Sequence, residues 1–336
     1  MAQSRTTIRD VAALAGVSHQ TVSRVINNSR SVRPETRARV EEAIHQLNYM
    51  PSAVARSMAR GHSCMIACLV PNLVDFTFGS IIEGGQMEAR SFDYLLVSSA
   101  APDESTFAAL MDEFAASRRV DGLVVVNPYM DNRTSFIPQG FPVIFTGSRS
   151  QNPAISSIAL NDLEAGRTAT SFLLESGHEH LCTITGPMIE DCSRDRLRGF
   201  QQQIREAGLP ENTNVLHGDW TAHSAYDAFK EYLGENEPPS AVFAQNDQMA
   251  IGVIRAAHEF GLHVPNELSV IGIDDMPLAS FFTPSLTTLR QDMAAIGKHA
   301  VQLLLHTIEH PDASAEHISI SPELVIRQSV ARNTRR

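Results

Sequence analysis

The sequence predicts an α/β protein with an N-terminal three-helix helix-turn-helix head, a short hinge helix and a two-lobed body built on parallel sheets. Two short amphipathic helices separated by a tight turn open the chain, and from about residue 61 short apolar runs alternate with helical stretches. Charge divides the chain at the same place. Residues 1–60 hold nine arginines and four carboxylates, a net charge of +5, whereas the remaining residues carry −16 and the whole chain −11. This asymmetry indicates that the head alone meets phosphate groups.

The first helix follows Thr7, which forms a capping box with Asp10 three residues on. Its apolar stripe consists of Val11, Leu14 and Ala15. Gly16 ends this helix and Ser18 begins the next, so only a tight turn fits between them. Two short helices joined this tightly cross at a large angle, which is the helix-turn-helix arrangement.

The second helix runs from Ser18, its N-cap, to Asn27. Val22, Val25 and Ile26 form its apolar side. The opposite side carries short polar groups and one arginine, namely His19, Gln20, Ser23 and Arg24. Because a surface helix more often carries Glu and Lys there, this face predicts a helix that reads base edges in a major groove.

A third helix begins near Pro34 and places Val40, Ile44 and Leu47 on one face, which closes a small core. The alternative is a three-helix cap that binds no ligand. That alternative does not explain the positive charge or the polar face of the second helix.

The run from Thr7 to Asn27, Thr-Ile-Arg-Asp-Val-Ala-x-x-Ala-Gly-Val-Ser-x-x-Thr-Val-Ser-Arg-Val-Ile-Asn, resembles the headpiece of the lac repressor / galactose repressor family. The resemblance implies binding to operator DNA, with His19, Gln20 and Arg24 as base-reading residues. It implies phosphate and groove-wall contacts for the residues around them, namely Thr7, Ser18, Thr21, Ser23, Asn27 and Thr36. The lac repressor has Tyr at the position of His19, so its operator sequence does not carry over unchanged.

Pro51 breaks the chain after the third helix, and residues 52–60 predict a short hinge helix that ends at Gly61. Nine residues are too few for a stable isolated helix, so a disordered linker remains the alternative in the free protein. The family resemblance implies that this segment folds on DNA and pairs with its symmetry mate. Met58 would then be the apolar wedge in the minor groove, Ala55 would permit close approach, and Arg56 would reach a phosphate.

In the body, short apolar runs alternate with helices, which predicts parallel strands covered on both faces. The runs are Met65–Val70, Tyr94–Val97, Gly122–Val126, Val143–Phe145, Leu181–Thr185, Val215–His217, Ala241–Ala244 and Ser269–Ile273. Two sets of four strands follow, on either side of about residue 160. We expect lobe 1 to span about 61–160 and 291–319, and lobe 2 about 161–290 and 320–331.

Ligands of open parallel sheets bind at the carboxyl ends of the strands. Amides, carboxylates, one arginine and aromatic rings follow these ends here, namely Asn72, Phe76, Phe78, Asn127, Arg196, Trp220, Asn246 and Asp274. Such a set suits a sugar, whose hydroxyls bond polar side chains and whose ring stacks on an aromatic face. A purine is the alternative ligand. Asn246 is also a candidate helix cap, and the two phenylalanines are candidate core residues.

The family resemblance continues through the body, which implies the periplasmic-binding-protein fold of an effector domain. It is carried by Asn161-Asp162, Gly186-Pro187, Arg196–Phe200, Asn246-Asp247 and Ser269–Asp275. By position, Arg196, Trp220, Asn246, Asp274 and Gln291 match the residues that hold the effector in this family. Thr146-Gly147 and Met293 depart from the pattern, so a galactoside-like binding mode is not implied.

Several classes are disfavoured. The four cysteines form no C-x-x-C pair or metal-ligand pattern, so buried free thiols are expected and no metal or cofactor is predicted. An enzyme is disfavoured by the absence of catalytic motifs, and a transported solute-binding protein by the basic head and the absence of a signal peptide. The sequence predicts a cytoplasmic protein with no membrane segment. The missing C-terminal heptads indicate a homodimer, which would bind a pseudopalindromic operator.

Overall fold

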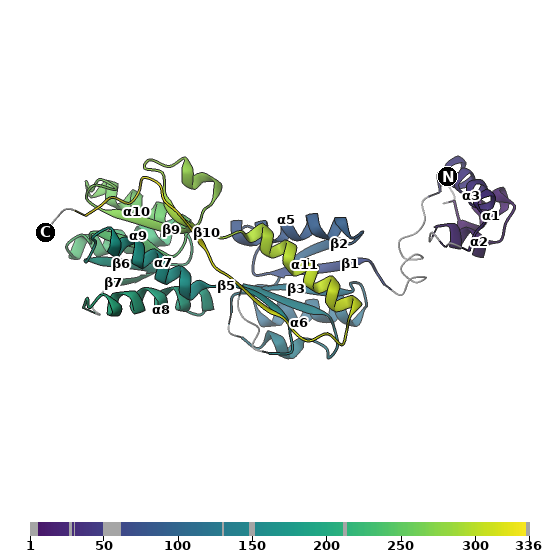
Figure 1. The fold of residues 1–336 in the computed structure, drawn as a ribbon, viewed down its shortest axis with the longest axis horizontal. Helices are drawn as coiled ribbons and strands as arrows, with labels where there is room; N and C mark the ends of the chain where they lie inside the picture. Colours follow the sequence, from purple (N-terminus) through teal and green to yellow (C-terminus); the bar gives the residue numbers. More distant parts are fainter. Residues whose placement is uncertain are drawn as a thin grey trace. The chain divides into compact units, whose positions relative to one another are not determined.

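The structure is a computed structural model that describes residues 6–26, 29, 31–49, 62–129, 131–147, 152–210 and 214–333. The chain forms two units, Met1–Cys64 and Met65–Arg336, which are described separately below. Figure 1 shows the elements of each unit.

The first unit contains the three predicted helices, α1 (Ile8–Ala15), α2 (His19–Ile26) and α3 (Pro34–Gln46). Asp10 accepts hydrogen bonds from the backbone N–H and the hydroxyl of Thr7, both at 2.8 Å, so the predicted capping box is present. Gly16 ends α1 with φ +63°, a left-handed conformation that glycine adopts without strain. The hydroxyl of Ser18 accepts a hydrogen bond from the Thr21 N–H, as expected of an N-cap.

A small apolar core holds the three helices together. One fully buried valine comes from each helix, and Ala12, Ala15, Val25 and Ala43 complete the cluster around Val11, Val22 and Val40. Leu14, predicted on the apolar stripe of α1, is 50% exposed. That prediction is wrong because the buried face of α1 is centred on Val11 and Ala15, which leaves Leu14 at its rim.

The second unit begins with a six-stranded parallel sheet of order β11-β5-β4-β3-β1-β2. Its strands are β1 (Met65–Val70), β2 (Leu95–Ala100), β3 (Gly122–Asn127), β4 (Val143–Gly147), β5 (Ser157–Leu160) and β11 (His317–Ile320). Helices α5 (Phe76–Ser91) and α11 (Met293–Glu309) lie together over one face (Figure 1). Helix α6 (Glu104–Met111) and the π-helix Asp112–Ala116 cover the other face. Alternate residues of β1 therefore enter two different cores, which explains its continuous apolar run.

The second sheet has the order β12-β10-β9-β8-β6-β7. Its parallel strands are β6 (Leu181–Thr185), β7 (Asn214–His217), β8 (Ala241–Ala244), β9 (Ser269–Asp274) and β10 (Thr287–Arg290), and the antiparallel edge strand is β12 (Glu323–Val325). Helices α7 (Asp162–Glu175) and α8 (Asp191–Glu206) cover one face. Helices α9 (Ala222–Glu235) and α10 (Asp247–Glu259) cover the other.

All eight predicted strands form, but the prediction of four strands in each set is wrong. Within the described residues each sheet has six strands, since β5, β10, β11 and β12 form in addition to the eight that were predicted. These four strands are short and each begins with a polar residue, so their apolar-run signal is weak. The chain crosses between the sheets after β5, β10 and β11, and the last crossing is the yellow segment in Figure 1.

Cys68 and Cys182 are buried, whereas Cys64 and Cys192 are partly exposed, so the expected burial of all four thiols is wrong for two of them. Burial raises the pKa of the Cys68 thiol to about 12. None of the helices within the described ranges combines the length and apolar character that a bilayer crossing demands.

Candidate functional site

The polar face of α2 is exposed. His19, Gln20 and Arg24 are solvent-exposed, while Val22 and Val25 on the opposite side are buried. This division leaves the side chains of His19, Gln20 and Arg24 exposed to solvent on one surface of the head. Arg37 has a different role, since its guanidinium donates to the Ser29 carbonyl at 2.7 Å and so ties α3 to Ser29.

The other predicted DNA contacts divide into two groups. Thr7 and Ser18 are exposed at the starts of α1 and α2, and Thr21, Ser23 and Thr36 are partly exposed. Asn27 and the hinge residues Ala55, Arg56 and Met58 lie outside the described residues, so their predicted roles stay predictions.

A cavity of about 130 Å³ lies between the two lobes of the second unit. Since one water takes up about 30 Å³ of liquid volume, this space corresponds to about four waters, or one small molecule. Strand ends and adjoining helices of both sheets line it. Seven of the predicted effector residues are in the lining, namely Asn72, Phe76, Phe78, Arg196, Trp220, Asn246 and Asp274.

The two remaining predicted residues, Asn127 and Gln291, are buried outside the lining. The Asn127 amide donates to the Tyr129 carbonyl at 3.0 Å, and its oxygen accepts from the Tyr129 N–H at 3.2 Å. Asn127 therefore shapes the turn that brings Tyr129 to the cavity. The amide of Gln291 has no hydrogen-bond partner within the described part of the chain.

Arg196 is the cation of the cavity, and it is held by the protein itself. Its Nε donates to Asp162 Oδ1 at 2.7 Å, its Nη1 donates to the Gln245 carbonyl, and both charged side chains are about 6% exposed. Burial acts to lower the pKa of Arg196, but the Asp162 carboxylate, together with the nearby Cys192 and Asp274, more than offsets it, so the pKa lies above its ordinary value. The guanidinium also lies 5.6 Å from the Trp220 ring centroid, within cation–π range.

Trp220 is fixed from several sides. Its indole N–H donates to Glu190 Oε2 at 2.9 Å, and its carbonyl accepts from the Asn246 amide at 3.0 Å. A Cβ at Gly186 would lie 2.2 Å from the indole ring, so only glycine leaves room for Trp220 here. Trp220 itself adopts φ +75°, the left-handed conformation that is uncommon for a bulky residue and is frequent at functional sites.

Asn246 combines its two predicted roles. It is the N-cap of α10, with its side-chain oxygen accepting from the Met249 N–H at 2.8 Å, and it also lines the cavity.

The next residue, Asp247, is fully buried. Asp247 accepts from the Thr288 hydroxyl at 2.6 Å and from the Met276 N–H at 2.8 Å. Burial raises the pKa of Asp247 to about 7, and these two hydrogen bonds act in the opposite direction.

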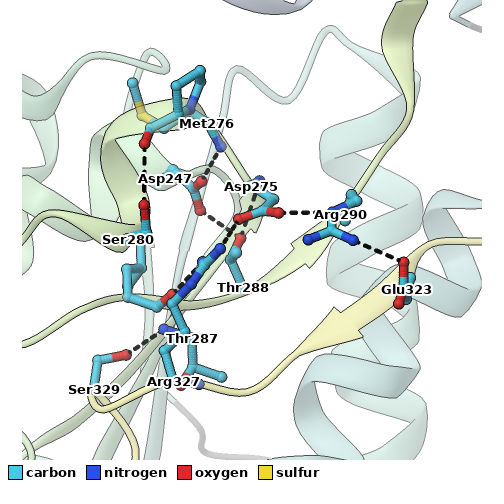
Figure 2. Close-up of polar contacts among 12 residues, drawn as sticks. Asp247, Asp275, Met276, Ser280, Thr287, Thr288, Arg290, Glu323, Arg327 and Ser329 are labelled. Carbon is cyan, nitrogen blue, oxygen red and sulfur yellow. Dashed lines mark hydrogen bonds and ion pairs between the residues drawn. The ribbon is translucent and has the colours of Figure 1, made fainter. Parts of the chain in front are cut away.

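The turn Asp274-Asp275 connects the cavity to the crossing strands. Both residues have positive φ, +122° and +53°. Figure 2 shows the guanidinium groups of Arg290 and Arg327 directed at the Asp275 carboxylate, and Arg290 Nε lies 2.8 Å from Asp275 Oδ2. Arg290 also pairs with Glu323 of β12 at 3.2 Å. Asp275 is thus anchored away from the cavity. Burial and the nearby Asp247 charge raise the pKa of Asp274 well above its ordinary value.

Sequence reasoning missed several lining residues, above all Asp162, Glu190, Tyr129, Gln248 and Met276. Asp162 has the signature of a helix N-terminal acid, which hides its ion pair with Arg196. Glu190 lies in the loop between β6 and α8, and only the fold carries that loop to the cleft. There Glu190 and Tyr129 form an antiparallel bridge between the lobes, next to a 3.0 Å hydrogen bond from the Asp191 N–H to the Pro128 carbonyl.

The described residues contain no cluster of three metal-ligating side chains.

Comparisons with known proteins match both units. The family described as bacterial regulatory proteins, lacI family, matches residues 7–52, and the periplasmic binding protein-like domain matches residues 170–330. The HTH-type transcriptional repressor PurR of Edwardsiella ictaluri is 37% identical over 97% of this chain and 97% of the relative. The ribose operon repressor of Escherichia coli K12 is 35% identical over 96% of this chain and 99% of the relative. A crystal structure of the lac repressor dimer bound to operator and the anti-inducer ONPF matches with a TM-score of 0.90, at 29% identity over 98% of this chain and 100% of that one.

Proposed function

The chain belongs to the lac repressor family of bacterial regulatory proteins, and from this premise we propose that it is a homodimeric transcriptional repressor controlled by a small hydrophilic effector. It acts in the cytoplasm on a pseudopalindromic operator and catalyses no reaction. The observation that carries the proposal is the exposed face of α2, with His19, Gln20 and Arg24, inside the segment that matches the family. Such a face forms bidentate contacts with base edges in the major groove.

We assign operator reading to residues 1–49, the hinge to residues 50–60, and effector binding and dimerisation to residues 61–336. Within the last segment, lobe 1 comprises about 61–160 and 291–319, and lobe 2 about 161–290 and 320–331. The three crossings after β5, β10 and β11 support this division.

The effector is a sugar in this proposal. Support comes from the mixture of hydrogen-bonding side chains and aromatic rings in the cavity lining, which suits a molecule with many hydroxyls. A purine is the second candidate, favoured by the rings of Phe76, Tyr129 and Trp220, which offer stacking surfaces for a planar base.

Control by the effector follows from where the cavity lies. A ligand that touches both lobes changes the relative stability of their arrangements, and it shifts DNA affinity only by its differential affinity for those arrangements, typically about 1–3 kcal/mol. The inter-lobe bridge of Tyr129 and Glu190 is next to the ligand, and Glu190 also accepts a hydrogen bond from Trp220. Ligand contact at Trp220 is therefore coupled directly to a contact between the lobes.

The test of the reading helix uses two single-arginine variants of the full chain. Operator sequences are first selected from a randomised duplex library. Arg24→Ala is expected to lose about 1–3 kcal/mol of discrimination between the selected operator and a scrambled one. Arg39→Ala removes the same charge from an exposed position of α3 and is expected to retain that discrimination. Equal discrimination by Arg24→Ala and the unaltered chain would refute the assignment of α2.

A further inference from the structure

The cavity wall carries more carboxylates than cations. Among the described residues that line it, Asp75, Asp162, Glu190 and Asp274 are acidic, and Arg196 is the basic residue. The number of charged residues does not by itself give the charge that a ligand meets, because some of these groups are neutralised within the protein. The relevant question is which carboxylates remain without a protein partner.

Two of the four carboxylates are committed to structural contacts. Asp75 is the N-cap of α5 and accepts a hydrogen bond from the Thr77 N–H at 2.8 Å. Asp162 forms the buried ion pair with Arg196 at 2.7 Å. The same guanidinium donates through Nη1 to the Gln245 carbonyl. An anionic ligand at Arg196 would therefore share this cation with the Asp162 carboxylate.

The other two carboxylates have few protein donors. Glu190 is 8% exposed and accepts from the Trp220 N–H at 2.9 Å and more distantly from the Cys192 thiol at 3.8 Å. The Asp274 carboxylate receives no hydrogen bond from the part of the chain that the structure describes. Burial raises the pKa of both groups, as expected of carboxylates that lack enough donors. Each leaves acceptor capacity facing the cavity.

Two donors of the wall already have partners within the protein. The Trp220 N–H donates to Glu190, and the Asn246 amide donates to the Trp220 carbonyl. Glu190 and Asp274 thus add acceptors for which the described chain supplies few donors. Such a wall favours a ligand with O–H donors, and the Glu190 carboxylate, which has no ion-pair partner among the described residues, repels a phosphate or carboxylate group.

We propose that Glu190, together with Asp274, selects an uncharged polyhydroxylated effector and rejects its phosphorylated or carboxylated analogues. This inference rests on the proposed function, because it takes the cavity to be the effector site. It deepens that function by assigning charge selectivity to Glu190, a residue outside the set predicted from the sequence. Two hydroxyls of the ligand donate to Glu190 and Asp274, and the ring lies on the aromatic side chains.

The test measures binding of paired probes to the full chain by thermal shift and by fluorescence of Trp220. The pairs are D-ribose and D-ribose 5-phosphate, D-glucose and D-glucose 6-phosphate, D-galactose and D-galacturonate, and inosine and inosine monophosphate. At least one neutral sugar is expected to bind, with its anionic partner at least about a hundredfold weaker. Binding of an anionic member as tightly as its neutral partner overturns the inference, and so does the failure of every neutral sugar to bind.

Variants then test whether Glu190 causes the selectivity. Glu190→Gln keeps an acceptor for the Trp220 N–H but removes the charge, and it is expected to shift the ratio of the two dissociation constants at least tenfold toward the anion. Asp274→Asn is expected to shift it in the same direction. Asp195→Asn removes one charge from α8 outside the cavity lining and should leave the ratio unchanged. Equal ratios in Glu190→Gln and the unaltered chain overturn the role of Glu190.

Operator binding separates this inference from the proposed function. If a phosphorylated sugar binds and changes operator affinity, the repressor function stands and the charge selectivity is wrong. If neutral sugars bind with the expected selectivity but the chain recognises no operator, the proposed function is wrong and the selectivity stands.

Discussion

Replacing Arg196 by Met tests the buried ion pair that forms one wall of the cavity. The substitution keeps much of the side-chain volume but leaves Asp162, which is 6% exposed, as an unpaired buried carboxylate. It also removes the donor to the Gln245 carbonyl. Removal of one partner from a buried ion pair costs about 3–5 kcal/mol, so we expect Arg196→Met to lower the free energy of unfolding by that amount.

Urea unfolding of the full chain provides the assay, followed by the fluorescence of Trp220, the one tryptophan, and by circular dichroism. The penalty should shrink as the pH is lowered, because burial already raises the pKa of Asp162 and a protonated carboxyl needs no cation. Adding Asp162→Asn should recover at least about 2 kcal/mol of the loss, since no unpaired charge then remains.

Arg194→Met is the matched control on the same helix. Arg194 is 37% exposed and pairs with Asp191, and exposed pairs of this kind contribute about 0–1 kcal/mol. If Arg196→Met costs no more than Arg194→Met, or if the double variant recovers nothing, the structural importance assigned to the Arg196–Asp162 pair is wrong.

Three further predictions concern other parts of the molecule. Burial raises the pKa of Asp247 from 3.8 to about 7, so the native protein should lose stability as the pH rises from about 4 through 7. Asp247→Asn should reduce this loss by at most about 4 kcal/mol in thermal unfolding between pH 4 and 9. A Cβ at Gly199 would lie 2.2 Å from the Leu163 carbonyl, so Gly199→Ala should destabilise the protein by about 1–3 kcal/mol, whereas Gly234→Ala, where no described atom lies within 4 Å, should not. Val22→Ala removes buried apolar volume from the core of the head, so it should destabilise the head by about 2 kcal/mol and lower its melting temperature. This variant should bind the operator more weakly, whereas ligand binding to the body should be retained.

Local sequence signals predicted the head well. The Thr7–Asp10 capping box and the stop at Gly16 depend on neighbouring residues, and both are present in the structure. The error at Leu14 has a related cause, since the spacing of apolar residues locates a stripe but does not locate its centre. In the body, the strands were predicted from their fully apolar runs. These runs occur because a sheet that is covered by helices on both faces needs apolar side chains on both faces.

The unpredicted features depend on contacts between distant residues. Strand β10, Thr-Thr-Leu-Arg, is recognisable only from its pairing with β9 and β12, and β11 pairs with β5 about 160 residues earlier. The lining of the cavity also depends on contacts between residues that are far apart in the sequence. Trp220 and Arg196 were predicted from their places after strands, but their partners Glu190 and Asp162 come from loops and helix ends that only the folded chain brings together.

Binding of the full chain to a selected operator duplex, with and without a bound neutral sugar, tests the central claim most directly. We expect two chains on each duplex, affinity for an inverted repeat about 10³-fold or more above that for a duplex with one half-site scrambled, and a ligand-dependent change of about 5–150-fold. Equal affinity for intact and scrambled duplexes would contradict the repressor function. An operator affinity that stays constant while the cavity fills with sugar would contradict its control by the effector.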